Sequence, residues 1–231
     1  MAIETLTAAE LVSQDPRWIR VFEQYHIDYC CKGDSPLGQL CQQRGIAIEQ
    51  LLQAFQSIAL QPPGSLLHVQ FWDLPLVVDF ILQNHHRFAR AALDELAQLL
   101  PTVLKHHRER LPVLVSLWEI FQRIDREFRA HLEREEQWVF PFVQSGELEK
   151  IPPQILDALR SEHDLEAAEF ERLRTLTRDF QPPPIECRKT QRTYDLLRHL
   201  YFDLHQHAFL ENHVLFPRLE QALQQQHSGE A

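Results

Sequence analysis

Four long segments of the chain carry apolar residues at steps of three and four, the spacing of an amphipathic α-helix. They cover about residues 73–100, 112–143, 153–180 and 185–223. Proline and glycine separate them, at Pro101, within residues 146–153 and in the three prolines at 182–184. Four helices of this length with short connections pack as an up-down-up-down four-helix bundle. The pattern therefore predicts an all-α fold.

The segments with helical spacing are shorter in the first 60 residues, which predicts a small module of short helices. Thr7 and Glu10 have the spacing of a capping box at a helix start. Residues 26–34 show no sustained period and include Cys30 and Cys31, so we expect a loop that presents two thiols. Residues 61–65 read Gln-Pro-Pro-Gly-Ser and break the helical pattern. We therefore predict a helical double-cysteine module over residues 1–60, a linker over 61–72 and the bundle over 73–225.

Composition and charge narrow the classes of function. Only 6 of the 231 residues are glycine, which favours helices. The net charge of −10 at pH 7 leaves no overall basic field, so we expect no nucleic-acid partner. No apolar run approaches the roughly 18 residues that span a membrane, and the first residues lack the features of a signal peptide. We expect a cytoplasmic protein with no membrane span and with its four cysteines reduced.

Two of the apolar stripes contain ionisable residues at positions that face the bundle core. The stripe of the second segment comprises Leu117, Phe121, Ile124, Phe128, His131, Glu135, Trp138 and Phe142, and that of the fourth comprises Leu197, Leu200, Leu204, His207, Glu211 and Val214. Both segments read H-x3-E-x4-F-P. A separation of four places His and Glu on one helical face, roughly 5 to 6 Å apart at Cβ. Both side chains therefore converge on one centre.

The other two segments each contribute an inward histidine. In the third segment it is His163, and in the first it is His86 or His85, since both have helical spacing with the apolar positions before them. His86 precedes His131 by 45 residues, and His163 precedes His207 by 44. The spacing predicts a duplicated helical hairpin, in which a lone His is followed by H-x3-E on the next helix.

Ionisable groups in an apolar core indicate a metal centre or a polar network. Burying them costs on the order of several kcal/mol unless each finds a partner. Four imidazoles and two carboxylates suit a pair of first-row transition ions, with bridging carboxylates and room for an oxo or hydroxo group and an exogenous ligand. The alternative is a buried His–Glu hydrogen-bond network without metal. Ligand type alone does not separate iron from manganese or zinc.

The bundle resembles the hemerythrin-like His-His-Glu cation-binding domains, and the whole chain resembles the di-iron proteins that repair iron-sulphur clusters. The matching motifs are Tyr29-Cys30-Cys31 after Asp28, Ser161-Glu162-His163-Asp164, Cys187 after the three prolines, and Glu211-Asn212 with Leu215-Phe216-Pro217-Arg218. One departure is Lys32, where the family usually has glycine directly after the cysteine pair, with Gly33 next.

The resemblance implies a ligand set, a cofactor and partners. The ligands of two iron ions, oxo- or hydroxo-bridged, would be His86, His131, Glu135, His163, His207 and Glu211. The choice of His86 over His85 comes from the resemblance. It also implies a cytoplasmic stress-response homodimer that acts on damaged iron-sulphur proteins, by labile iron donation, by nitric oxide binding, or by both. Cys30 and Cys31 would then be redox or iron-transfer thiols.

Other functions and residues stay open at this point. A hemerythrin-type protein that binds or senses oxygen or nitric oxide is one alternative, and a di-iron nitric oxide or peroxide reductase is another, so whether the chain is an enzyme is undecided. Glu136, Glu162 and His107 are candidates to support the ligands from behind. Cys187, at a helix start, is either a thiolate favoured by the helix dipole or a buried structural thiol. The histidines expected in solvent are His199, His205, His213 and His227.

Overall fold

The computed structural model describes residues 2–59 and 69–229, and side chains up to residue 225. Within these residues the regular structure consists of helices, with one isolated β-bridge between Thr7 and Pro36 and no strand. The all-α prediction is confirmed. Most of the predicted linker falls on residues 60–68, which lie outside the described residues.

The first part of the chain forms a module of short helices. They are η1 (Ile3–Thr5), α1 (Ala8–Gln14), α2 (Trp18–Gln24), α3 (Leu37–Arg44) and α4 (Ile48–Ala59). The predicted capping box is present at α1, where the Thr7 hydroxyl accepts from the Glu10 N–H and the Glu10 carboxylate accepts from the Thr7 N–H. Residues 25–36 connect α2 to α3 and carry the cysteine pair.

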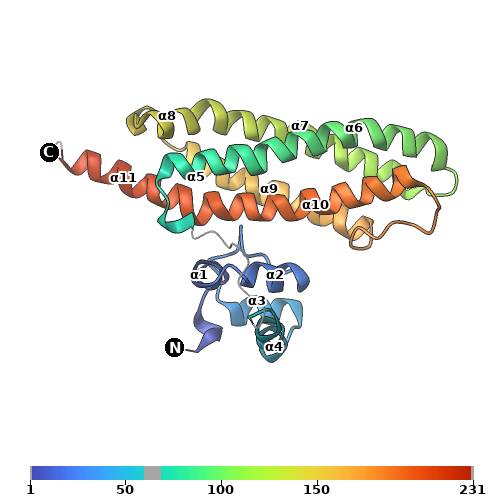
Figure 1. Ribbon diagram of the computed structural model, residues 1–231, viewed down its shortest axis with the longest axis horizontal. Coiled ribbons are helices and arrows are strands. Elements are labelled where there is room, and N and C mark those ends of the chain that lie inside the picture. The colour runs from blue at the N-terminus through green and yellow to red at the C-terminus, as the bar shows by residue number, and fades with distance from the viewer. Residues whose placement is uncertain (1, 60–68, 230–231) are drawn as a thin grey trace.

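The second part of the chain contains four long helical stretches that lie side by side (Figure 1). The short helix η2 (Val69–Phe71) precedes them. The stretches comprise α5 (Leu74–Phe80), η3 (Ile81–His86) and α6 (Arg87–His107); α7 (Val113–Trp138) and α8 (Phe140–Ser145); α9 (Ile155–Leu176), after η4 (Leu148–Lys150); and α10 (Arg188–Leu210), η5 (Glu211–Leu215) and α11 (Phe216–Gly229). The loops between successive stretches lie at alternating ends (Figure 1).

Two helix ends differ from the sequence prediction. The first stretch continues through Pro101 to His107, although proline lacks the N–H that an interior helical position donates. Leu100 and Val103 are buried there, so the apolar stripe continues across the proline and its packing outweighs the lost hydrogen bond. The third stretch ends at Leu176 rather than near 180, because residues 178–180 adopt positive φ angles.

The second stretch also breaks earlier than predicted. α7 ends at Trp138, and the next residue, Val139, leaves the helical conformation with φ −125° and ψ −61°. The three-four spacing therefore stops applying at this point. Trp138 was expected in the core, but its side chain is 48% exposed.

The hydrophobic core has two parts with a polar layer between them. One part joins the first module to the end of the bundle formed by α5, α8 and α11, and includes Phe22, Tyr29 and Phe216. The other part fills the opposite half of the bundle and includes Phe121 and Leu200. The buried histidines and glutamates lie between the two parts.

The module packs on α10 and η5 of the bundle. Tyr29 lies against Phe209, with ring centroids 5.8 Å apart, and the Gln206 amide donates to Glu23 Oε1 at 2.9 Å. The double-cysteine loop thus lies beside the helix that carries His207.

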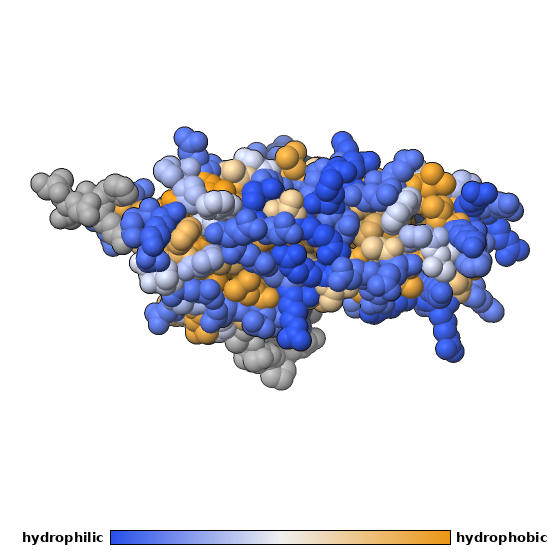
Figure 2. Space-filling view, turned by 90° about the horizontal axis from the view of Figure 1, so that it is seen from above, coloured by the Kyte–Doolittle hydropathy of each residue, from blue (hydrophilic) through white to orange (hydrophobic). Residues whose placement is uncertain are grey.

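One face of the molecule is mainly hydrophilic. Figure 2 shows one face, on which hydrophobic residues form separate small patches among polar ones. Among the described helices, none combines the length and the apolar character that a membrane crossing requires.

Candidate metal centre

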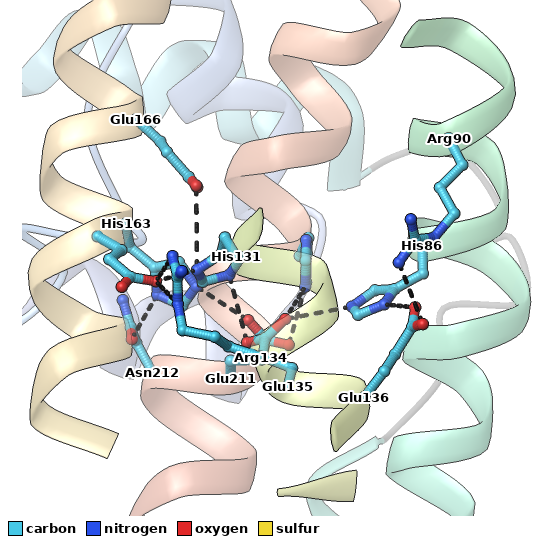
Figure 3. A network of polar contacts seen from close by, with 12 residues as sticks. His86, Arg90, His131, Arg134, Glu135, Glu136, His163, Glu166, Glu211 and Asn212 are labelled. Carbon is cyan, nitrogen blue, oxygen red and sulfur yellow. Dashed lines mark hydrogen bonds and ion pairs between the residues drawn. The ribbon is translucent and has the colours of Figure 1, made fainter. Parts of the chain in front are cut away.

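All six predicted ligands meet in the polar layer between the two core parts (Figure 3). Their ligand atoms form two groups, each within 4.8 Å. One group comprises His86, Glu135, His207 and Glu211, and the other comprises His131, Glu135, His163 and Glu211. Both carboxylates belong to both groups, whereas each imidazole belongs to one.

Glu135 lies between two imidazoles from different helices. Its Oε2 is 3.3 Å from Nε2 of His86, and its Oε1 is 3.3 Å from Nε2 of His131. Each oxygen of this carboxylate therefore faces a different group.

Glu211 repeats this arrangement in the other half of the bundle. Its Oε1 is 2.8 Å from Nε2 of His207, and its Oε2 is 3.0 Å from Nε2 of His163. Each group thus offers two imidazole nitrogens and one oxygen from each of two carboxylates, a donor set suited to two ions that share both carboxylates.

Two π-helical turns occur where the ligands lie. η3 ends with His85 and His86, and η5 begins with Glu211 and Asn212. An extra residue in a helical turn shifts the register, and such turns are frequent at functional sites. His85 and His86 are therefore both buried although they are adjacent, and residues 211–213 all contact other elements.

Three imidazoles are held through Nδ1 by a residue on a neighbouring helix (Figure 3). His86 Nδ1 is 2.8 Å from Glu136 Oε1, and His131 Nδ1 is 2.9 Å from Glu162 Oε2. His163 Nδ1 is 3.0 Å from the amide oxygen of Asn212. Such partners fix the ring orientation and direct Nε2 toward the centre.

Within the described residues, several polar atoms in the layer have no hydrogen-bond partner. They are Nε2 of His86, both oxygens of Glu135, Nδ1 of His207 and Oε2 of Glu211. In addition, Nε2 of His131 and Nε2 of His163 face each other at 3.1 Å. Unsatisfied buried acceptors are costly in a purely structural network. Cations between these atoms would satisfy them, so the residues fit a metal pair.

The charges of the layer also fit cation binding. Burial and the nearby Glu211 oppose ionisation of Glu135, but the imidazoles of His131 and His86 lower its pKa on balance. Burial lowers the pKa of His207 well below the usual imidazole range. The carboxylate is therefore ionised and His207 is neutral, the forms in which these side chains bind metals. The neighbouring carboxylates outweigh burial and raise the pKa of His86, to about 9, and the pKa values of His131 and His163. Without an ion these three imidazoles are protonated, and a bound metal would displace their protons.

Residues 77–219 match the family model described as the hemerythrin HHE cation-binding domain. The chain belongs to this family. The six clustered residues all fall within the HHE domain, and residues 5–59 match a second model, ScdA_N, described as a domain of unknown function. The predicted family is confirmed.

Curated relatives of this HHE protein align over nearly the whole chain. The iron-sulfur cluster repair protein ScdA of Staphylococcus haemolyticus is 26% identical over 211 residues, which cover 90% of this chain and 95% of the relative. The iron-sulfur cluster repair protein YtfE of Escherichia coli is 29% identical over 220 residues, which cover 94% and 98%. A YtfE of Shigella boydii matches to the same extent.

Two of the histidines considered from the sequence belong to neither ligand group of the HHE domain. His85 points to Asp203, with Nδ1 2.8 Å from Oδ1, and stacks on His207 at 5.8 Å between ring centroids. His107 lies in the last turn of α6, beside Cys187. Because Cys187 precedes His207 by 20 residues along α10, roughly 30 Å of helix separates His107 from the centre. The expectation that His107 supports the ligands is wrong.

The expectation of solvated histidines is correct for His199 and wrong for two others. His205 is buried, and its Nδ1 donates to the Tyr201 carbonyl. His213 packs under the module and donates from Nε2 to the Cys30 carbonyl at 2.7 Å. Both face the module, which a single-helix pattern cannot reveal. The side chain of His227 lies outside the described residues.

The double-cysteine loop is folded around Asp28. Its Oδ1 accepts from the backbone N–H groups of Cys30, Cys31 and Lys32. The two sulphur atoms are 3.4 Å apart as free thiols. Cys30 is buried, and burial raises its pKa well above the usual thiol range. Cys31 is half-buried and lines a cavity of about 360 Å³ between the module and the HHE domain.

Gly33 allows the loop to approach the HHE domain. A Cβ at this position would lie 2.6 Å from Nε2 of His213 and would also collide with the Tyr29 carbonyl. The glycine is therefore required at 33, one residue later than the family pattern, while Lys32 occupies the position after the cysteines.

Cys187 caps the start of α10 and is partly exposed. The hydroxyl and backbone N–H of Thr190 and the ring of His107 lower its pKa to about 6. Of the two interpretations left open by the sequence, the thiolate fits the structure.

Sequence reasoning missed two residues of the centre. Glu166 is buried on α9, with Oε1 3.9 Å from Nδ1 of His131, and burial raises its pKa to about 7 (Figure 3). It lies three residues after His163, so helical spacing was an available signal. Asn212 had been noted only as part of a motif.

Proposed function

We propose that this protein repairs iron-sulphur clusters damaged by oxidative or nitrosative stress, through a labile di-iron centre in the HHE domain. The observation that carries the proposal is the pair of His2Glu2 groups that share both carboxylates, with the double-cysteine loop hydrogen-bonded to the same helix turn. The names of the relatives, which align with both parts of the chain, support the same function.

In this proposal the six residues hold two iron ions. His86 and His207 would bind one ion, His131 and His163 the other, and the two glutamates would bridge them. Bound iron would supply a redox-active pair that takes a small ligand such as nitric oxide or oxygen and that can be given up.

The protein's other residues would orient the ligands. Glu136 and Glu162 hold their imidazoles through Nδ1 and are themselves paired with Arg90 and Arg134. These carboxylates are partly exposed, so each connects a buried imidazole to the surface.

The cysteines would act on the damaged iron-sulphur protein that is being repaired. Cys31 is reachable from the cavity between the module and the HHE domain, whereas Cys30 is buried beside it. Two adjacent thiols can accept or pass iron, or exchange electrons. We also propose that the protein works in the cytoplasm as a homodimer, on damaged iron-sulphur proteins.

Elemental analysis of protein from iron-replete cells, purified without a metal-affinity tag, tests the centre. About two irons per chain are expected from two groups of four ligands. One zinc, or no metal after careful handling, would overturn the di-iron proposal.

A cysteine variant tests the repair function. The double variant Cys30→Ala, Cys31→Ala should keep its iron but lose the ability to restore a purified iron-sulphur enzyme inactivated with nitric oxide. Cys187→Ser is the matched control, because it removes a thiol far from the loop, and it should repair normally. Full repair by the double variant would show that the cysteines are dispensable, as expected of a hemerythrin-type carrier or sensor.

A further inference from the structure

The two halves of the duplicated bundle support equivalent histidines in different ways. In the first half, Glu136 follows Glu135 and holds His86. In the second half, the residue that follows the equivalent Glu211 and holds the equivalent histidine is Asn212. A carboxylate therefore occupies one position and a neutral amide the other. The duplication provides an internal comparison for what the amide does.

Asn212 makes a second contact that a carboxylate cannot make. Its Oδ1 accepts from Nδ1 of His163 at 3.0 Å, and its Nδ2 donates to the Cys30 carbonyl at 3.3 Å. Glutamate or aspartate accepts only, so it could hold the imidazole but not the carbonyl. The amide thus joins the metal layer to the double-cysteine loop through one side chain.

We propose that Asn212 is a positioning residue that couples metal occupancy of the centre to the reactivity of the cysteine pair. The inference rests on the proposed function, because it takes His163 as a ligand. Asn212 touches neither a reacting thiol nor the ligand position of an ion. It acts through the His163 ring on one side and the Cys30 backbone on the other.

The coupling follows from how the His163 ring is held. An ion on Nε2 would fix the position of the ring, while Nδ1 donates to Asn212 Oδ1 and Asn212 Nδ2 donates to the Cys30 carbonyl. Without an ion, Nε2 contacts Glu211 Oε2 at 3.0 Å and Nε2 of His131 at 3.1 Å. The ring, and with it the Asn212 amide and the Cys30 carbonyl, is then held less firmly.

The loop has little else that senses the centre. His213 also donates to the Cys30 carbonyl, but no contact places it on a ligand imidazole, so it holds the loop equally in both states. Asp28 holds the loop from within the module. Ion loss should therefore loosen the cysteine backbone through Asn212 and expose the thiols.

Alkylation of Cys31 by iodoacetamide, followed by mass spectrometry, measures the coupling in apo and iron-loaded full-length protein. All variants carry Cys187→Ser to remove the other partly exposed thiol. The iron-loaded protein that carries only Cys187→Ser should be alkylated about three- to tenfold more slowly than its apo form, as expected for one net hydrogen bond. Release of iron to a chelator is measured in parallel.

Two single variants separate support of the imidazole from coupling to the loop. Asn212→Asp keeps the acceptor for His163 but removes the donor to Cys30. It should retain iron, while its loaded and apo forms react equally. Glu136→Gln is the matched control, because it changes the equivalent residue in the half without a cysteine loop. It should release iron faster, and its apo form should still be alkylated faster than its iron-loaded form by the same factor.

Several results would overturn the coupling. One is an Asn212→Asp variant in which the apo protein is still alkylated faster than the iron-loaded protein by the original factor. Another is a Glu136→Gln variant in which the apo and iron-loaded forms are alkylated at the same rate. If Asn212→Asp does not fold, Asn212→Ala serves instead. It should make the alkylation rates of the apo and iron-loaded forms equal and should also speed iron release. If the protein without a change at residue 212 binds two irons but its apo and iron-loaded forms are alkylated at the same rate, only the coupling is refuted. If it binds no iron, the proposed function is refuted as well.

Discussion

Replacing Glu135 by leucine tests whether the polar layer exists to bind metal. Glu135 is wholly buried, and neither of its oxygens has a hydrogen-bond partner in the part of the chain that the structure describes. An unsatisfied buried polar atom costs about 1–3 kcal/mol. Attraction to the imidazoles of His86 and His131 offsets part of that cost, and these rings can become neutral when the carboxylate is gone. We therefore expect apo Glu135→Leu to be within about 2 kcal/mol of the apo wild type.

The iron-loaded state should respond very differently. Ligand at 100 times its dissociation constant stabilises a fold by about 2.7 kcal/mol per site, so two ions contribute about 5 kcal/mol. For a chain of this length, that corresponds to a rise in Tm of roughly 10–20 °C. Since Glu135 belongs to both ligand groups, the variant should show no such rise.

Thermal unfolding with and without ferrous iron, together with iron analysis, measures both effects. Glu133→Leu is the control, because Glu133 is exposed on the same helix and should leave iron content and the Tm rise unchanged. Retention of two irons by Glu135→Leu would remove this carboxylate from the ligand set. An apo variant that fails to fold would show that the carboxylate is structural.

Three further outcomes are expected. His86→Leu should lose iron while His85→Leu retains it, as iron analysis would show, because only His86 faces the shared carboxylates. Alkylation of Cys187 should have its midpoint near pH 6, so the thiol stays reactive above that pH and becomes unreactive as pH falls through it; a midpoint near 9 would contradict the lowered pKa. Gly33→Ala should cost about 1–3 kcal/mol in thermal unfolding, because the added methyl group meets His213, and an unchanged Tm would show that the loop adapts.

The residues that hold the imidazoles through Nδ1 could not be predicted from the spacing within one helix. Glu162 directly precedes His163 in the chain, but it holds His131 on the neighbouring helix. Glu136 and Asn212 likewise reach across to other helices. The partner of a side chain depends on how two helices pack, and the spacing within one helix does not contain that information.

The sequence by itself determined the helical class and the residues that enter the polar layer, although its periodicity left His85 and His86 open and the choice of His86 came from the family resemblance. The reason is that a period of 3.6 residues places every third or fourth side chain on one face, and the core accepts ionisable groups only at a cost. Only the tertiary structure decided the π-helical turns, the continuation of the first stretch through Pro101, the helix end at Trp138, and the docking of the cysteine loop against His213. These features depend on contacts between residues far apart in the chain, which override local spacing and propensity.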